Sequence, residues 1–152
     1  KTKIEYTKKA DVVAVPNPVV EVFTDTIIGN SKVMDICITP QRKVHRIEIF
    51  ADTSYILNTL KINQLEIEQE GKFKFNDRIS NKLLTYYVVD NTPLELQISI
   101  PKNQKTEFII YEASYDLLDN KLLDVPARYT SMIPKPFVLN DAVLVKKKVK
   151  IN

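Results

Sequence analysis

The sequence has very little of the residues from which most catalytic and cofactor sites are built. It contains one histidine, His45, and one cysteine, Cys37, and its only glycines are Gly29 and Gly71. Catalytic zinc usually takes three protein ligands, so a zinc enzyme built from this chain would depend almost wholly on carboxylates. Phosphate-cradling loops need several glycines close together, because the backbone must approach the anion. We therefore expect neither a metal site nor a nucleotide-binding loop.

The same scarcity argues against nucleophilic catalysis. A Ser-His-Asp arrangement would have to use His45, and no Gly-x-Ser-x-Gly elbow accompanies it. Cys37 cannot form an intrachain disulfide, and its place in a strand-like run predicts a buried small hydrophobe. Tryptophan, the best ring for stacking on a sugar, is absent, which weakens a carbohydrate-binding interpretation. The sequence predicts no catalytic residue and no metal ligand in this chain.

The overall composition is that of an ordinary globular domain. The 152 residues suit one domain, with 44% hydrophobic and 27% charged residues. A net charge of +3 is too small to indicate nucleic-acid binding. No apolar run approaches the roughly 18 residues that a membrane-spanning helix needs. The first residue is Lys1 and not Met, so we expect further sequence upstream.

Short runs rich in Val, Ile, Tyr and Phe follow one another along most of the chain. Residues 94–100 give the clearest alternation of apolar with polar or small side chains, as expected of a strand with one buried face. Gly29-Asn30 lies between two such runs and suits a tight hairpin turn. The expected strands are residues 19–28, 32–39, 44–50, from 60 onward, 83–89, 94–100, 105–113 and 142–151.

These strands predict an all-β domain, an antiparallel β-sandwich (jelly-roll-like) with at most one or two short helical turns. Residues 116–118 are the candidate for such a turn, with Ser114 as its cap. Residues 1–18 are lysine-rich and then proline-punctuated, which indicates a linker from a missing upstream region. Residues 19–152 are then the β-sandwich domain.

Two segments are harder to assign. Residues 55–65 fit either a short helix or a strand, and we favour a strand from residue 60 because residues 66–69 and 72–75 would then form a hairpin around Gly71. Residues 125–140 contain three prolines, so regular structure cannot continue for long there. The final lysine-rich run, residues 145–151, predicts a strand with a solvated face, and the alternative is contact with a membrane surface or a phosphate.

Four charged residues near the C-terminal end are the weak candidates for a binding or structural site. Glu112 and Asp116 could form a functional carboxylate pair, although such pairs also stabilise loops. Arg128 could pair with Asp116 or Asp141 and hold the proline-rich segment against the domain. In that arrangement the apolar side chains of the segment would pack over the sandwich. Those apolar side chains are Met132, Ile133 and Phe137.

Three motifs in this part of the chain carry a resemblance to a known family. They are residues 111–118 (YEASYDLL), 125–128 (VPAR) and 132–142 (MIPKPFVLNDA). Together they resemble the extreme C-terminus of the multi-pass membrane zinc aminopeptidases related to vacuolar membrane protease and the endoplasmic-reticulum metallopeptidase, bacterial members most of all. Upstream the likeness is looser. Residues 60–63 match a strand that relatives often end with Asn-Gly, and Gln64 replaces that glycine here.

In that family a zinc peptidase domain comes first, membrane helices follow, and a soluble β-rich domain ends the chain. The resemblance implies a non-catalytic accessory domain on the extracytoplasmic (periplasmic) side, supporting stability, docking or substrate access. Zinc would lie in the absent peptidase domain, because no residue here matches the zinc-ligand motif. The implied partners are the protein's own peptidase and transmembrane regions and a peptide substrate, with membrane contact only through the parent chain and no nucleic acid.

Two other functions remain open. One is a free-standing β-sandwich module that binds a peptide or glycan, and the more remote one is an enzyme acting through Glu112 and Asp116. An exposed aromatic cluster on one sheet would favour the binding module. A large apolar patch near residues 1–18 would favour a domain that docks against its own protein.

Overall fold

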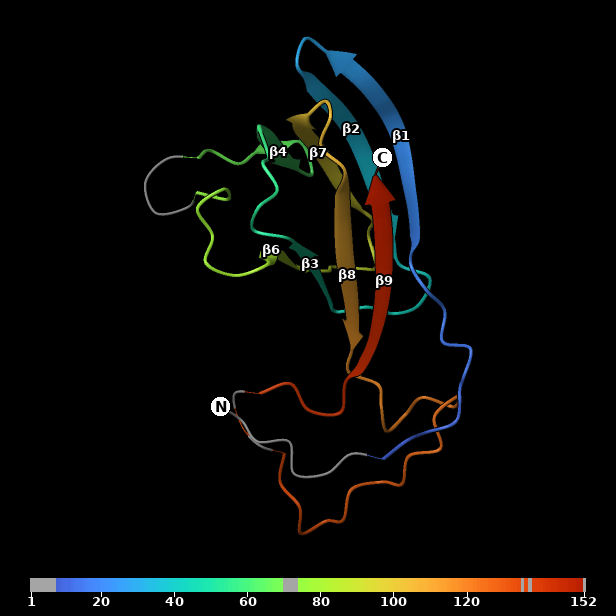
Figure 1. The fold of residues 1–152 in the computed structure, drawn as a ribbon. Helices are drawn as coiled ribbons and strands as arrows, with labels where there is room; N and C mark the ends of the chain where they lie inside the picture. Colours follow the sequence, from blue (N-terminus) through green and yellow to red (C-terminus); the bar gives the residue numbers. More distant parts are fainter. Residues whose placement is uncertain (1–7, 70–73, 135, 137, 152) are drawn as a thin grey trace.

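The computed structural model describes residues 8–69, 74–134, 136 and 138–151. Within these ranges the chain forms nine strands and no helix, so the predicted antiparallel β-sandwich is confirmed (Figure 1). The strands are β1 (Val19–Ile28), β2 (Ser31–Thr39), β3 (Arg46–Ala51), β4 (Thr59–Ile62), β5 (Leu65–Glu66), β6 (Lys82–Tyr87), β7 (Leu94–Pro101), β8 (Thr106–Ser114) and β9 (Val143–Ile151).

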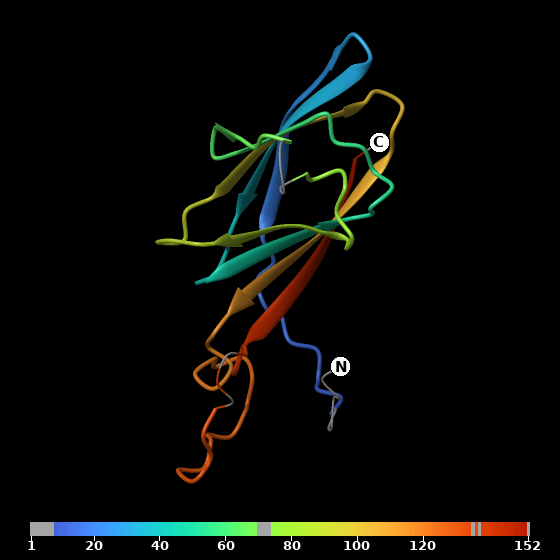
Figure 2. The same cartoon turned by 90° about the vertical axis from the view of Figure 1, so that its left-hand side faces the viewer.

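The strands are divided between two sheets that form the two layers of the molecule (Figures 1 and 2). One sheet has the order β1-β2-β7-β4-β5 and the other has the order β6-β3-β8-β9, and every pairing is antiparallel. The strand orders β1-β2-β7-β4 and β3-β8-β9 correspond to the A-B-E-D and C-F-G sheets of immunoglobulin-type sandwiches, and β6 is an additional strand beside β3. This arrangement describes the fold and carries no function by itself.

The β1–β2 hairpin forms where the sequence predicts it. Gly29 has a φ of 61°, which a two-residue hairpin turn needs at its first central position. The ladder runs from Ile28 opposite Ser31 to Val19 opposite Thr39, with one irregularity between Val22 and Thr24. The residue inserted there is Phe23, so β1 carries a β-bulge in an edge strand.

The core forms because inward-facing and outward-facing side chains alternate along the strands. Along β2 the inward positions Met34, Ile36 and Ile38 are buried, while the positions between them are half-buried on the outer face. The same alternation operates on β3 and β7, so inward residues from both sheets meet in one layer. The buried cluster consists of Met34, Ile36, Ile38, Val44, Ile47, Ile49, Ala51, Leu57, Leu60, Phe75, Leu94, Leu96, Ile98, Ile100, Phe108, Ile110 and Ile151.

The described arms of the hairpin expected around Gly71 are not paired strands, because residues 67–69 and 74–75 lie outside any strand. The chain turns earlier, at Asn63-Gln64, whose φ angles are 46° and 70°, and β5 pairs back on β4. Asn63 is fixed there by long-range contacts: its backbone nitrogen donates to the Glu95 carbonyl at 2.9 Å, and its side chain reaches the Tyr86 hydroxyl at 3.0 Å. Gly71 itself lies outside the described residues.

The segment between β8 and β9 is irregular, as its prolines predict. The candidate helical turn at residues 116–118 is a single hydrogen-bonded turn, with the Asp119 nitrogen donating to the Asp116 carbonyl at 3.0 Å. Both figures show this segment beyond one end of β8 and β9, at the same end of the molecule as residues 8–18 (Figures 1 and 2). The sandwich and this loop are therefore two structurally different regions.

Candidate functional site

A carboxylate lies in the interior of the sandwich at the end nearest the loop. Glu112 is opposite Ile47 of β3 and Val145 of β9, both of which are buried. It follows Phe108 and Ile110 on the inward face of β8 and is 0% exposed. The alternation that buries the apolar side chains of β8 thus also buries an ionisable one.

The Glu112 carboxyl group has an unusual electrostatic environment. Neither of its oxygens has a hydrogen-bond partner among the described residues. Burial raises the pKa of Glu112 from 4.5 to about 7, because the charged form loses its hydration, and the nearby cations of Arg42 and Lys147 limit the rise. The group can therefore take up or release a proton near neutral pH.

Arg42, from the loop between β2 and β3, joins this carboxylate region to the start of the β8–β9 loop. Its guanidinium group donates to the Ser114 hydroxyl and, at 3.2 Å, to the backbone carbonyl of Glu112. The Ser114 hydroxyl donates to one carboxylate oxygen of Asp116, and the Asn120 amide donates to the other at 3.0 Å. Asp116 therefore fixes the loop, and no hydrogen bond brings it to Glu112.

Lys147 is an inward-facing lysine on the last strand. It lies opposite the buried Ile110, and its ammonium group donates to the carbonyl of Pro18 at 2.8 Å. The neighbouring lysines 146 and 148 are exposed, as the expected solvated face requires. Sequence reasoning treated the lysines as one group, although the alternation with Val143 and Val145 places Lys147 on the buried face.

Of the two expected partners of Arg128, the structure selects Asp141. The two side chains form an ion pair in which both carboxylate oxygens accept from one guanidinium nitrogen. The backbone carbonyl of Asp141 also accepts from the Leu117 nitrogen at 3.0 Å. These contacts close the base of the β8–β9 loop, so that its two ends are tied together before β9 begins.

The middle of this loop presents apolar side chains to solvent. Ile133 is 86% exposed, Tyr129 is 74% exposed and Met132 is 54% exposed. The expectation that Met132 and Ile133 pack over the sandwich is therefore wrong, and Phe137 lies outside the described residues. A turn in which the Met132 nitrogen donates to the Tyr129 carbonyl, together with the closed base, holds the loop beyond the sheet faces.

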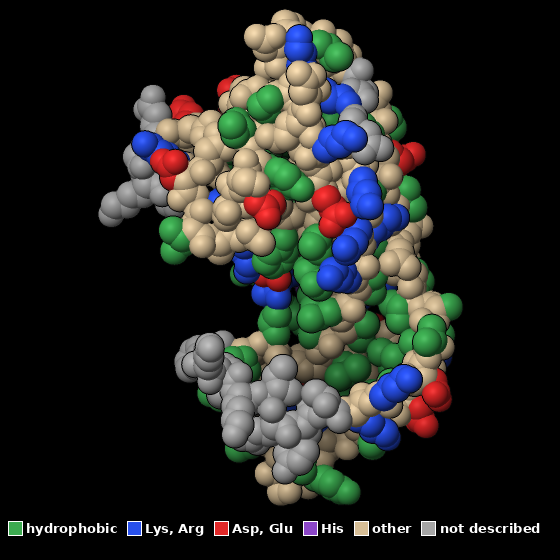
Figure 3. Space-filling model, in the orientation of Figure 1, with side chains coloured by type: hydrophobic (Ala, Val, Ile, Leu, Met, Phe, Trp, Pro, Cys, Tyr) green, Lys and Arg blue, Asp and Glu red, His purple; other side chains and the backbone are tan. Residues whose placement is uncertain are grey.

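We call this apolar region the loop surface. Its residues are Leu122, Tyr129, Met132, Ile133, Val138 and Leu139. Figure 3 shows that hydrophobic side chains also gather where the molecule is hollowed between the sandwich and the loop below it. These six exposed apolar side chains all come from residues 122–139, and the segment that carries them lies at the end where residues 8–18 approach the sandwich (Figure 1).

The remaining sequence candidates have structural contacts. The His45 ring stacks on Tyr115 at 4.7 Å between centroids, and its Nδ1 accepts from the Tyr115 backbone nitrogen at 3.3 Å. Cys37 is half-buried on the outer face of β2, so the expectation that it is buried is wrong, because it shares the outward parity of Asp35. Nothing in these contacts points to nucleophilic chemistry.

Comparison with known proteins finds no matching family model, no similar curated protein and no similar solved structure. Within the described ranges, no three His, Cys, Asp or Glu side chains gather closely enough to hold a metal ion. The part of the chain that the structure describes also contains no helix that is long and apolar enough to cross a membrane.

Proposed function

We propose that this domain is a non-catalytic accessory domain of a membrane-bound zinc-dependent aminopeptidase and that it docks on its own peptidase and transmembrane regions. In this proposal the zinc is bound by the peptidase domain, and the accessory domain lies on the extracytoplasmic side. It would support the stability of the enzyme or restrict access of peptide substrates. The proposal rests on the resemblance of residues 111–142 and on one structural observation, the exposed loop surface.

The loop surface carries the proposal because contacts within the loop fix its base and yet leave the apolar side chains of the loop surface uncovered. The Arg128–Asp141 pair and the Asp116 contacts fix the base of the loop, so the exposure is not that of a loose chain end. Burying exposed apolar area contributes about 25 cal/mol per Å², so covering several such side chains would favour docking. The expected occupant is the parent protein itself, near the point where residues 8–18 approach the sandwich.

The alternative binding module for a peptide or glycan has weaker support as the main function. Exposed aromatic side chains among the described residues are distributed over different elements. Phe23 lies on β1, Tyr87 lies on β6 in the other sheet, and Tyr129 lies on the loop. This distribution does not form the aromatic cluster on one sheet that such a module would be expected to display.

The first test is an immunoblot of membrane and soluble fractions from the native source, with antibody raised against this domain. A band several times heavier than 17.5 kDa and confined to membranes is the expected result. Aminopeptidase activity in the immunoprecipitate that is lost on adding a chelator would further support the proposal. A band of about the domain's own mass in the soluble fraction would overturn the proposal.

The second test separates docking from folding with a matched pair of variants in the full-length protein. Ile133→Ser removes an exposed isoleucine from the loop surface, whereas Ile79→Ser removes an isoleucine that is at least as exposed from the loop before β6. We expect the first variant alone to make the domain more accessible to protease in intact membranes, with the thermal midpoint of the isolated domain unchanged in both. Equal accessibility in the two variants would count against docking through the loop surface.

A further inference from the structure

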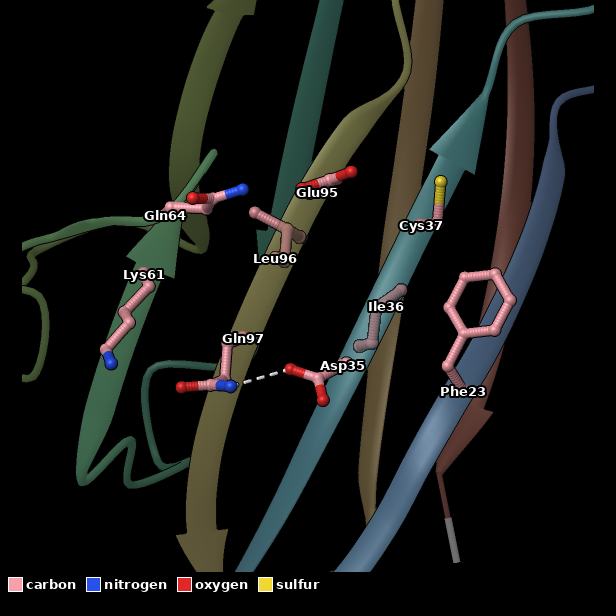
Figure 4. A pocket seen from close by; sticks show the side chains of 9 residues that line it. All are labelled: Phe23, Asp35, Ile36, Cys37, Lys61, Gln64, Glu95, Leu96 and Gln97. Atoms are coloured by element: carbon pink, nitrogen blue, oxygen red, sulfur yellow. Dashed lines mark hydrogen bonds between the residues drawn. The ribbon is translucent and has the colours of Figure 1, made fainter.

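The outer face of the β1-β2-β7-β4 sheet carries a row of polar side chains at right angles to the strands. Register places Asp35 of β2 opposite Gln97 of β7, and Gln97 opposite Lys61 of β4. All three point outward, because the residues beside them in each strand point into the core. Figure 4 shows these side chains side by side, with the Gln97 amide donating to the Asp35 carboxylate at 2.8 Å.

An exposed aromatic ring stands at one end of this row. Phe23 is the residue inserted at the β1 bulge, and it is 68% exposed. In Figure 4 its ring lies beside Asp35 and Cys37, at the opposite end of the row from Lys61. A bulge re-aims a side chain, so this irregularity places an apolar ring where a regular edge strand would not.

A second row of side chains lies beside the first. Cys37 of β2 lies opposite Glu95 of β7, and Gln64 from the β4–β5 turn stands beside Glu95. Together with the first row these residues line a hollow of about 430 Å³. A hollow of this size is in the range of small-ligand sites.

The chemistry of the lining favours a ligand that carries hydroxyl groups and one apolar face. Gln97 can offer both a donor and an acceptor, Lys61 offers donors, and Glu95 offers acceptors. A sugar hydroxyl both donates and accepts, and the C–H face of a sugar ring can stack on an aromatic ring such as Phe23. Two carboxylates and one ammonium group in the lining give no strong attraction to an anionic ligand.

An extended peptide fits this face less well. β2 and β7 lie inside the sheet, and each is hydrogen-bonded to a strand on both sides. A peptide that binds by strand addition needs an unpaired edge, and the edge at this site is β1, beside Phe23. A peptide added there would run alongside β1 and would not cross Asp35, Gln97 and Lys61. Recognition must therefore come from side chains alone, as it does for an oligosaccharide laid across the strands.

We propose that this face, which we call the sheet-face site, binds a short uncharged oligosaccharide extending from Phe23 to Lys61. The distance across the four strands is about 14 Å, from three spacings of about 4.8 Å. One ring stacks on Phe23, and the hydroxyls of the following rings bind Gln97, Asp35 and Lys61. This site is separate from the loop surface and does not depend on docking.

The test is a titration of the isotope-labelled domain with cellohexaose, xylohexaose, mannohexaose and chitohexaose, followed by nuclear magnetic resonance. We expect at least one of these probes at millimolar concentration to shift the amide signals of residues 23, 35, 61 and 97. Phe23→Ala and Gln97→Ala should each weaken that binding at least about tenfold, which is about 1.4 kcal/mol. Tyr87→Ala, which removes an exposed ring from the other sheet, is the matched control and should leave the affinity unchanged.

Several results would overturn the inference. No shift with any of the four sugars would do so, as would shifts that survive Phe23→Ala or that lie on the loop instead. A neutral hexapeptide that shifts the same signals when no sugar does would show that the ligand is a peptide. Ile133→Ser should leave sugar binding unchanged, so a failure of docking and a failure of sugar binding can be told apart.

Discussion

The strands and the β8–β9 loop both contain many apolar residues, yet the two regions use them in opposite ways. In β7, Leu94, Leu96 and Ile98 occupy every second position and are buried. In the loop, Met132 and Ile133 have no period and are exposed. Apolar residues are therefore predicted to be buried only where the strand period places their side chains on a face that packs against another sheet.

A second contrast lies inside the sandwich. Most inward positions are aliphatic, but towards the end nearest the loop the inward positions also include Glu112 and Lys147, with Arg42 near Glu112. The stability of the aliphatic interior depends on close packing, whereas the contribution of the charged end depends on whether Glu112 is protonated. Four measurements, from the largest expected effect to the smallest, test these two contrasts.

Substitution in the aliphatic interior should have the largest effect. Ile98→Ala removes a fully buried side chain and leaves a cavity between the sheets. We expect the free energy of unfolding to fall by about 2–5 kcal/mol, the usual range for such truncations. Urea denaturation measures this loss, and a loss below about 1 kcal/mol would mean that the sheets are not closely packed there.

Glu112→Gln should reduce the pH dependence of stability. The Glu112 carboxyl has a pKa of about 7 in the folded protein against 4.5 when unperturbed, so the folded state holds the proton more tightly between these values. Its contribution is therefore fully favourable below 4.5 and is lost as the pH rises towards 7. The shift amounts to at most about 3 kcal/mol.

Urea denaturation in acidic and in weakly alkaline buffer measures this contribution of Glu112 to the pH dependence of stability. The wild-type protein should lose stability between the two conditions, and Glu112→Gln should lose less, with a gain of stability in the alkaline buffer. Asp119→Asn, at an exposed carboxylate on the loop, is the control and should follow the wild type. An identical pH dependence in Glu112→Gln would place the titration elsewhere.

Arg128→Ala tests the closed base of the loop. The ion pair with Asp141 is about one-third exposed, so its loss should lower the free energy of unfolding by about 1 kcal/mol or less. Arg128→Lys should recover part of the loss, because one donor can still reach Asp141. A melting temperature that does not change in Arg128→Ala would show that the backbone contact at Asp141 closes the base without the ion pair.

Ile133→Ala should have the smallest effect on the isolated domain. The side chain is exposed, so the free energy of unfolding should change by no more than about 0.5 kcal/mol. The same truncation costs several times more at Ile98 if the two regions differ as described. A loss similar to that of Ile98→Ala would mean that the loop packs on the sandwich in solution.

Much of the fold could be predicted because its determinants are local. The alternation in residues 94–100 and the Gly29-Asn30 pair were sufficient to place β7 and the first hairpin. The Asn63-Gln64 turn could not be found in this way, since contacts of Asn63 with Glu95 and Tyr86 fix a turn in which both residues have positive φ. Such contacts exist only after the sheets have formed.

The candidate site was predictable only in part for the same reason. The Arg128–Asp141 pair was one of two expected pairings, because both residues flank a single segment. The proximity of Arg42 to Glu112 joins residues seventy positions apart, and it depends on the pairing of β3 with β8. The sheet-face site likewise depends on register, which no short motif encodes.

The bond between Lys147 and the Pro18 carbonyl has a mechanical consequence. Residues 8–18 leave β1 roughly along its own direction, so tension on this segment would pull β1 lengthwise past β2 (Figures 1 and 2). In that geometry the rungs of the β1–β2 ladder share the load, instead of breaking one after another from an end. The hydrogen bond from Lys147 also connects β9 to Pro18, the residue directly before β1. A pulling force applied through residues 8–18 would therefore act on β2 and β9 together, and β1 should resist extension more strongly than its place at the edge of the sheet would indicate.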